Sequence, residues 1–162
     1  MKGLYSLFVQ SYTALVKGAA LSGNQKALDW LSGRRQIMKR LANFGPHQHD
    51  ITWIHAASLG EFEMARPLVQ KFKEAHPEEK IVVTFFSPSG YNALENDQDI
   101  DLTTYLPIDK KKETQSFLEL LNPKRALFVK YEFWPNLLDQ IIEKKIPFYI
   151  VSATFRRDHL LF

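Results

Sequence analysis

Short apolar runs alternate with segments of helical periodicity along most of this chain. Residues 51–57 and 81–86 are nearly continuous runs of β-branched, aromatic and aliphatic side chains, as expected of strands buried on both faces. Shorter runs of the same character occupy residues 102–106, 125–129 and 148–151. Apolar positions at helical spacing separate them, in residues 61–75, 91–95, 110–121 and 135–144. This alternation predicts a Rossmann-like α/β domain, in which helices flank a parallel sheet.

The first 45 residues have a different pattern, with two helical segments and no strand. An uncharged stretch at residues 3–16 is shorter than the roughly 20 apolar residues that a membrane-spanning helix needs. One face of this helix is apolar, formed by Leu4, Phe8, Tyr12, Leu15 and Ala19. The helix could lie in a membrane interface or pack on the body of the protein, and both interpretations stay open. A second helix is predicted at residues 26–41, before a linker at 45–50 that divides a leader of residues 1–45 from a domain of residues 46–162.

The charge is distributed unevenly between these two parts. The leader has seven lysines and arginines against Asp29 alone, a net charge of +6, whereas the remaining 14 bases and 17 acids give −3. A basic leader on a mildly acidic body predicts contact with an anionic surface through one end. Few base-stacking aromatic residues lie between the basic ones, so we expect a membrane surface and no nucleic acid.

The basic residues also include a cluster in the domain. Lys110, Lys111 and Lys112 fall in the first turn of the predicted helix that begins near Asp109, for which Asp109 is the predicted N-cap. Cations are unfavourable at this end of a helix dipole. The cluster indicates either solvent exposure or a phosphate or carboxylate partner.

Several classes of chemistry have no support in the sequence. The chain has no cysteine, so it forms no disulfide and no thiolate metal site, and the paired histidines His47 and His49 have too few neighbouring ligands to predict a metal. Neither a G-x-G-x-x-G turn, nor a P-loop, nor a G-x-S-x-G elbow is present. We therefore expect no metal and no cofactor.

Small and charged residues follow three of the predicted strands. They are Ser58 to Glu61, Ser87 to Gly90, and Lys130 to Asn136. The carboxyl ends of parallel strands share one edge of a sheet, where α/β proteins bind ligands. These loops therefore predict a common crevice with two glutamates and a lysine.

Glu61 and Glu132 each have a structural interpretation beside the functional one. Ser58 to Glu61 fits a capping box, in which the serine caps the helix and the glutamate reaches back to its amide. Glu132 lies between a buried strand and a helix that begins with proline, where it could cap the helix, form an ion pair or act on a ligand. Trp134 is interpreted as a core residue rather than a stacking platform.

Four ordered motifs carry a family resemblance. They are His55-Ala-Ala-Ser-Leu-Gly-Glu61, Ser87-Pro-Ser-Gly90, Tyr105-Leu-Pro-Ile-Asp109 and Glu132-Phe-Trp-Pro-Asn136. In order and spacing they resemble the amino-terminal half of the 3-deoxy-D-manno-octulosonic acid (Kdo) transferases, bacterial glycosyltransferases that attach Kdo to the lipid A precursor. The resemblance implies a GT-B architecture, in which one Rossmann-like half binds the acceptor and the other binds mainly the donor CMP-Kdo.

The resemblance also implies roles for particular residues. Glu61 matches the glutamate taken to be the general base of an inverting transfer that needs no metal, and Glu132 matches a second glutamate near the site. The acceptor-binding set inferred from the same loops is Ser58, Gly60, Ser87, Ser89, Gly90 and Lys130. Lys130 departs from the family pattern, because many members have an acid at this position.

Further expectations concern the whole molecule. The chain resembles only the acceptor-binding half, so we expect it not to transfer sugar by itself. The resemblance places the enzyme at the cytoplasmic face of the bacterial inner membrane, where the basic leader would contact anionic lipids. The alternative function is a stand-alone, flavodoxin-like α/β binding module.

Overall fold

A five-stranded parallel sheet forms the centre of the fold in the computed structural model, which describes residues 2–154. Its strands are β1 (Ile51–Ala56), β2 (Lys80–Phe85), β3 (Leu102–Tyr105), β4 (Arg125–Val129) and β5 (Phe148–Val151). The order β3-β2-β1-β4-β5 places the first strand at the centre, where Ile54 pairs with both Val83 and Leu127. The predicted Rossmann-like α/β fold is confirmed.

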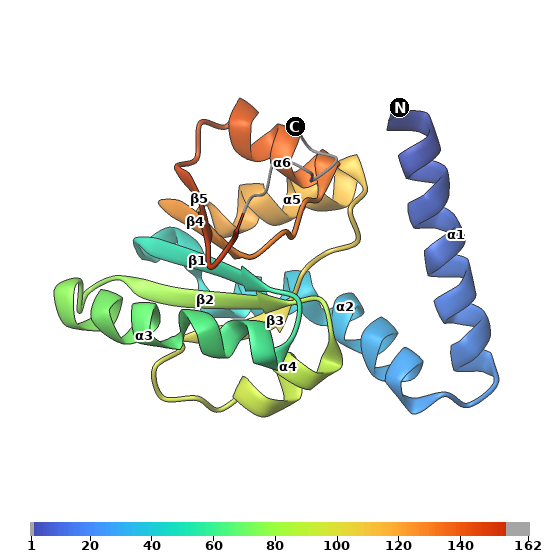
Figure 1. Ribbon diagram of the computed structural model, residues 1–162, viewed down its shortest axis with the longest axis horizontal. Helices are drawn as coiled ribbons and strands as arrows, with labels where there is room; N and C mark the ends of the chain where they lie inside the picture. Colours follow the sequence, from blue (N-terminus) through green and yellow to red (C-terminus); the bar gives the residue numbers. More distant parts are fainter. Residues whose placement is uncertain (1, 155–162) are drawn as a thin grey trace.

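Helices cover both faces of this sheet (Figure 1). On one face lie α3 (Leu59–Ala75) and α4 (Pro88–Leu94), and on the other lie α2 (Gln25–Phe44), α5 (Lys111–Leu121) and α6 (Pro135–Glu143). Because side chains alternate along a strand, Trp53 of β1 joins the core beneath α2, α5 and α6, while Ile54 joins the core beneath α3. The apolar runs are therefore buried on both faces.

Helix α1 (Lys2–Leu21) lies opposite the carboxyl ends of the strands (Figure 1). Tyr12 approaches Phe86, just after β2, with 6.0 Å between ring centroids, and Val9 and Thr13 are buried. Large apolar side chains on the rest of the helix stay exposed, including Leu4 (77%), Leu7 (60%), Phe8 (65%) and Leu15 (73%). The helix thus packs on the body and also presents an apolar face to solvent.

Helix α2 belongs to the core of the domain. Its side chains Ile37 and Leu41 are buried against the sheet, and Gly45, with φ of 65°, ends the helix in the left-handed conformation. A 3₁₀ turn, η1 (Pro46–Gln48), then leads into β1. The division between residues 1–45 and 46–162 stays a prediction. Helix α2 precedes this boundary in the sequence but packs in the core of the domain that follows it.

The predicted N-cap at Asp109 is wrong. Lys110 occupies the N-cap position of α5, and the Asp109 carboxylate instead accepts hydrogen bonds from the backbone N–H groups of Asn136 and Leu137, at 3.1 and 2.9 Å. These groups belong to the first turn of α6, whose own N-cap residue, Trp134, forms no capping bond with its side chain. Asp109 therefore caps a helix that is distant in sequence, as side-chain oxygens do for orphan donors.

Candidate active site

Three loops meet at the carboxyl edge of the sheet, after β1, β2 and β4. Since β1 lies between β2 and β4, the loop that contains Glu61 has the other two on either side. The backbone N–H of Ser87 donates to the carbonyl of Ala57 at 2.9 Å, which joins the first two loops directly. The topology thus brings together the segments that the sequence singled out.

Glu61 lies in the first turn of α3 and is partly buried. Its Oε2 accepts a hydrogen bond from the backbone N–H of Ala57 at 2.8 Å, whereas the Ser58 side chain forms no capping bond. The predicted capping box is therefore wrong for Ser58, while Glu61 does reach back to the turn, one residue earlier than expected. A Cβ added at the exposed Gly60 would meet no atom within 4 Å.

Two ring nitrogens contact the Glu132 carboxylate. Its Oε2 lies 3.3 Å from Nε2 of His55, and it accepts a hydrogen bond from Nε1 of Trp134 at 3.1 Å. The Glu132 side chain is 19% exposed, and that of His55 is fully buried. The carboxylate is therefore neither a free surface charge nor a cap of α6.

A buried chain of hydrogen bonds continues behind His55. Nδ1 of His55 lies 3.0 Å from the Thr84 hydroxyl, which accepts from Nε1 of Trp53 at 2.9 Å. Nδ1 also lies 3.0 Å from the Thr84 backbone carbonyl, so it can donate to that carbonyl or accept from the hydroxyl, and in the tautomer that accepts there the proton on Nε2 donates to Glu132. The β2 and β1 strands thereby fix the orientation of a glutamate that follows β4.

The sequence did not reveal this relay. His55 was noted only as part of a motif, and Thr84 is a single polar residue within an apolar run. The position of Thr84 in a run that predicts a strand buried on both faces is the signal that could have singled it out. Thr84 is fully buried, and a buried hydroxyl needs a hydrogen-bond partner.

Two further motif residues form a junction beside the site. Besides capping α6, Asp109 accepts a hydrogen bond from the Tyr5 hydroxyl of α1 at 2.7 Å, and its backbone carbonyl accepts from Nδ2 of Asn136 at 2.7 Å. Burial raises the pKa of the Asp109 carboxyl, against the opposite effect of the hydrogen bonds from Tyr5, Asn136 and Leu137. This junction holds the leader helix against the loop that carries Glu132.

The remaining predicted residues take different positions. The Ser87 and Ser89 hydroxyls lie 3.0 Å apart at the start of α4, which begins at Pro88 and not near residue 91. Gly90 is buried, and a Cβ there would lie 2.1 Å from Cδ1 of Phe85, so the close packing of α4 on β2 requires glycine. Lys130 has φ of 61° and turns the chain after β4.

An aromatic wall separates the loops from α1. The Trp134 ring stacks on Phe86, with centroids 5.1 Å apart and an angle of 25° between planes. Both rings line a cavity of about 330 Å³, here called the aromatic pocket, which Phe8 and Tyr12 of α1 also line. Trp134 packs against the core and also faces this cavity, so neither of the two sequence interpretations excludes the other.

Comparison with protein families shows which family the chain belongs to. Residues 32–160 match the model of the family described as 3-deoxy-D-manno-octulosonic-acid transferase (kdotransferase). The chain belongs to this family. The match includes all four motifs and most of α2, and it confirms the resemblance seen in the sequence.

Individual relatives agree with the family match. The chain is 35% identical over 102 residues to the 3-deoxy-D-manno-octulosonic acid transferase of Haemophilus influenzae, covering 62% of the chain and 24% of the relative. The corresponding protein of Aquifex aeolicus is 37% identical over 102 residues, covering 62% and 27%. A bifunctional glycosyltransferase/methyltransferase of Fusobacterium nucleatum is 32% identical over 104 residues, covering 62% and 16%. The chain thus spans about a quarter or less of the length of these relatives.

Two structural features of residues 2–154 bear on membranes and metals. This part of the Kdo transferase chain contains no helix that is both long and apolar enough to cross a bilayer. It also contains no cluster of three or more histidine, aspartate or glutamate side chains suited to a metal ion.

Proposed function

We propose that the chain supplies the acceptor-binding half of a GT-B enzyme that transfers Kdo from CMP-Kdo to a lipid A precursor. The observation that carries this proposal is the placement of Glu61 in a family-matched chain. Its carboxylate lies in the first turn of α3, at the carboxyl end of the central strand, and Glu132, which contacts His55, follows the neighbouring strand β4. Ligands bind at this edge in open α/β sheets.

In the proposed reaction Glu61 is the general base. It removes the proton from an acceptor sugar hydroxyl, and the oxygen attacks the anomeric carbon of Kdo as the bond to CMP breaks. CMP leaves with the bonding electron pair, so a single displacement inverts the anomeric centre. Glu132, oriented by His55 and Trp134, holds the acceptor, together with Ser58, Gly60, Ser87, Ser89, Gly90 and Lys130 from the adjoining loops.

The leader is proposed to dock on the cytoplasmic face of the inner membrane. Its apolar side chains at Leu4, Phe8 and Leu15 are exposed, and its first 45 residues carry a net charge of +6. A helix of this kind lies in the headgroup region, with its apolar face inserted and its basic residues near anionic lipid. The acceptor would then enter the site from the bilayer beside α1.

The experiment is a transfer assay with the complete natural polypeptide that contains this chain. CMP-Kdo and lipid IVA are supplied in mixed micelles, and the lipid product is resolved by mass spectrometry. The proposal predicts a product heavier by the mass of each Kdo residue added. No Kdo incorporation, with the substrates shown intact, would favour the flavodoxin-like binding module instead. The expected inactivity of the 162-residue chain by itself is a separate prediction of the same assay.

A further inference from the structure

A row of polar side chains crosses the apolar core near the carboxyl ends of the strands. His55 of β1 stands opposite Thr84 of β2, and Thr84 stands opposite Thr104 of β3, so these three residues share one level of the sheet. All three are fully or almost fully buried, and Glu132 joins the row after β4 through its contact with His55. Buried polar groups need hydrogen-bond partners, and the available partners decide where the protons lie.

Thr84 offers His55 both a donor and an acceptor. Its hydroxyl and its backbone carbonyl each lie 3.0 Å from Nδ1 of His55. An unprotonated Nδ1 accepts from the hydroxyl, and Nε2 then carries the proton of the neutral ring. A protonated Nδ1 donates to the carbonyl, and Nε2 of the neutral ring then presents a lone pair to Glu132, 3.3 Å away. The two tautomers therefore present opposite groups to the carboxylate.

The balance of donors and acceptors favours the tautomer with the proton on Nε2. Nε1 of Trp53 donates to the Thr84 hydroxyl at 2.9 Å, so this oxygen accepts one hydrogen bond and has its own proton to donate. Within residues 2–154, the acceptor that contacts this hydroxyl is Nδ1 of His55. A protonated Nδ1 would leave the buried hydroxyl without an acceptor, which is costly. In the favoured tautomer each group donates to the next, and the series ends on Glu132.

The Glu132 end of this series leaves one carboxylate oxygen available. Both contacts of the carboxylate within the described residues fall on Oε2, from His55 and from Nε1 of Trp134 at 3.1 Å. Oε1 has no hydrogen bond or ion pair in this part of the chain, with Lys130 included, and the side chain is 19% exposed. Two N–H donors stabilise the ionised carboxylate and fix its orientation. Oε1 is thus oriented to accept a hydrogen bond from a ligand hydroxyl.

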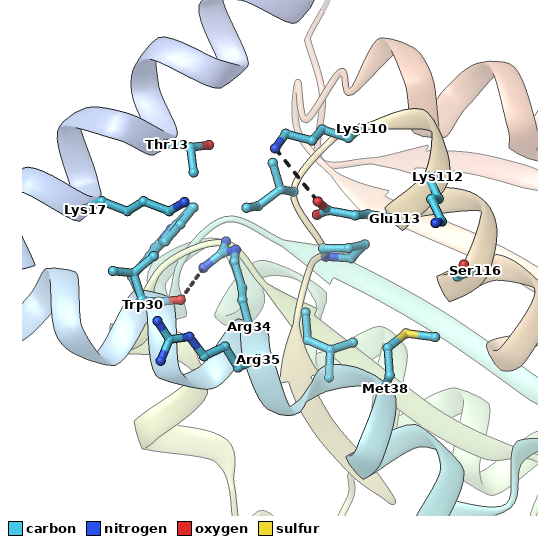
Figure 2. Close-up of a pocket in the computed structure, with 14 residues that line it drawn as sticks. Thr13, Lys17, Trp30, Arg34, Arg35, Met38, Lys110, Lys112, Glu113 and Ser116 are labelled. Atoms are coloured by element: carbon cyan, nitrogen blue, oxygen red, sulfur yellow. Dashed lines mark hydrogen bonds and ion pairs between the residues drawn. The ribbon is translucent and has the colours of Figure 1, made fainter.

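The other ionisable groups around this row have partners of their own. Glu61 and Asp109 accept hydrogen bonds elsewhere, from N–H groups of the loop after β1 and of α6. Arg34 of α2 donates to two backbone carbonyls, one of them within α2 (Figure 2). The ring of Phe128 packs edge-on against His55, with centroids 5.0 Å apart. The proton of the imidazole is therefore governed by its two hydrogen-bonded neighbours.

We propose that His55 and Thr84 are positioning residues that keep Glu132 ionised and oriented toward the sugar acceptor. The Thr84 hydroxyl holds His55 in the tautomer that donates through Nε2, and Glu132 then accepts a hydrogen bond from a sugar hydroxyl through Oε1. This inference rests on the proposed function for the identity of the ligand, whereas the proton positions belong to the folded protein alone.

The first measurement determines the tautomer of His55 and needs no substrate. The complete natural polypeptide is labelled with isotopically enriched histidine, and the ring nitrogen signals of His55 are identified in magnetic resonance spectra by their loss in His55→Gln. The proposal predicts a proton on Nε2 and none on Nδ1 at neutral pH. Thr84→Val removes the donor to Nδ1 and keeps the carbonyl, so the midpoint at which His55 takes up a second proton should rise by roughly 0.5–1 pH unit.

Two matched variants separate the hydroxyl from its surroundings. Thr84→Ser keeps a hydroxyl at the same position, so the tautomer and the midpoint should stay as in the natural protein. Thr104→Val removes a buried hydroxyl from the next strand, where it has no hydrogen-bond partner within residues 2–154, and it should also leave both unchanged. Thermal melting shows whether each variant folds. A proton on Nδ1 in the natural protein, or equal midpoints in Thr84→Val and Thr84→Ser, would overturn the proposal.

The second measurement is the pH dependence of kcat/KM for the lipid acceptor. A second proton on His55 lowers the charge of the pair with Glu132 and weakens it as an acceptor. The acidic limb of the profile should therefore move upward in Thr84→Val by the same interval as the midpoint, and not in Thr84→Ser or Thr104→Val. A loss of rate that is equal at every pH would indicate a merely structural role and would also overturn the proposal. Kdo transfer by a protein with the proton on Nδ1 would remove this inference alone, whereas the predicted tautomer without transfer would remove only the proposed function.

Discussion

Removal of the Asp109 carboxylate tests how the leader and the site are joined. Asp109→Ala deletes the acceptor for two N–H groups of α6 and for the Tyr5 hydroxyl. Loss of a helix cap costs about 1 kcal/mol, and a buried N–H left without an acceptor, here that of Leu137, costs roughly 1–3 kcal/mol. The free energy of unfolding should therefore fall by about 2–4 kcal/mol. Burial raises the pKa of Asp109, because ionisation of the buried carboxyl is unfavourable. Removing the carboxyl also removes this unfavourable free energy, which offsets part of the loss.

The assay is urea unfolding at neutral pH, followed by far-ultraviolet circular dichroism. Tyr5→Phe is the matched variant, because it removes only the 2.7 Å hydrogen bond between α1 and Asp109 and should cost about 1 kcal/mol. In the Asp109→Ala background the same change should cost much less, since its partner is already gone. A loss below about 0.5 kcal/mol for Asp109→Ala, or additive effects in the double variant, would refute this account of the junction.

Three other predictions concern stability and the membrane. Burial raises the pKa of Glu79, but hydrogen bonds from Arg125, Lys124 and Thr52 outweigh this effect and lower the pKa to about 2. The stability that Glu79 contributes should therefore be lost as pH falls from about 4.5 towards 2. The free energy of unfolding of Glu79→Gln, measured in urea, should depend less steeply on pH in this range, and an unchanged slope would contradict the assignment. Gly90→Ala should lower the free energy of unfolding by about 1–3 kcal/mol, because the added methyl group would overpack against Phe85. Gly60→Ala, with open space around it, should leave the free energy of unfolding unchanged. Equal melting temperatures for the two variants would contradict the packing argument. The double variant Leu4→Ser, Leu15→Ser should sediment less with anionic vesicles, whereas Ile142→Ser, a change at an equally exposed position on α6, should not. Equal sedimentation of the natural protein, the double variant and the control would mean that α1 serves only as a packing element.

The sequence predicted what local patterns determine. The apolar runs predicted the five strands β1 to β5. A strand buried on both faces of a parallel sheet has a nearly continuous apolar sequence, which can be recognised without knowing the strands that pair with it. Crossover connections then placed three loops at one edge of the sheet. Glu61 was found because its spacing after a strand and before a helical pattern is a local signal.

Contacts between distant elements were beyond this reasoning. Asp109 was assigned to the helix that follows it, yet it caps α6, 27 and 28 positions further on. The link from Thr84 through His55 to Glu132 depends on the register of β1 and β2, which sets the two residues opposite each other. Similarly, the sequence pattern did not indicate that Lys110 and Lys112 line one cavity together with basic side chains of α1 and α2.

The central claim is that Glu61 is the base of Kdo transfer, and Glu61→Gln in the complete natural polypeptide tests it most directly. Glutamine keeps an oxygen that can accept the 2.8 Å hydrogen bond from Ala57 but cannot take up a proton at neutral pH. Glu63→Gln, on an exposed position of the same helix, is the matched control. The account predicts that the Glu61 variant melts within a few degrees of the natural protein and transfers Kdo roughly 10²- to 10⁴-fold more slowly, with little change in acceptor binding, while the control retains its rate. A folded Glu61→Gln enzyme that transfers Kdo at a near-natural rate would contradict it.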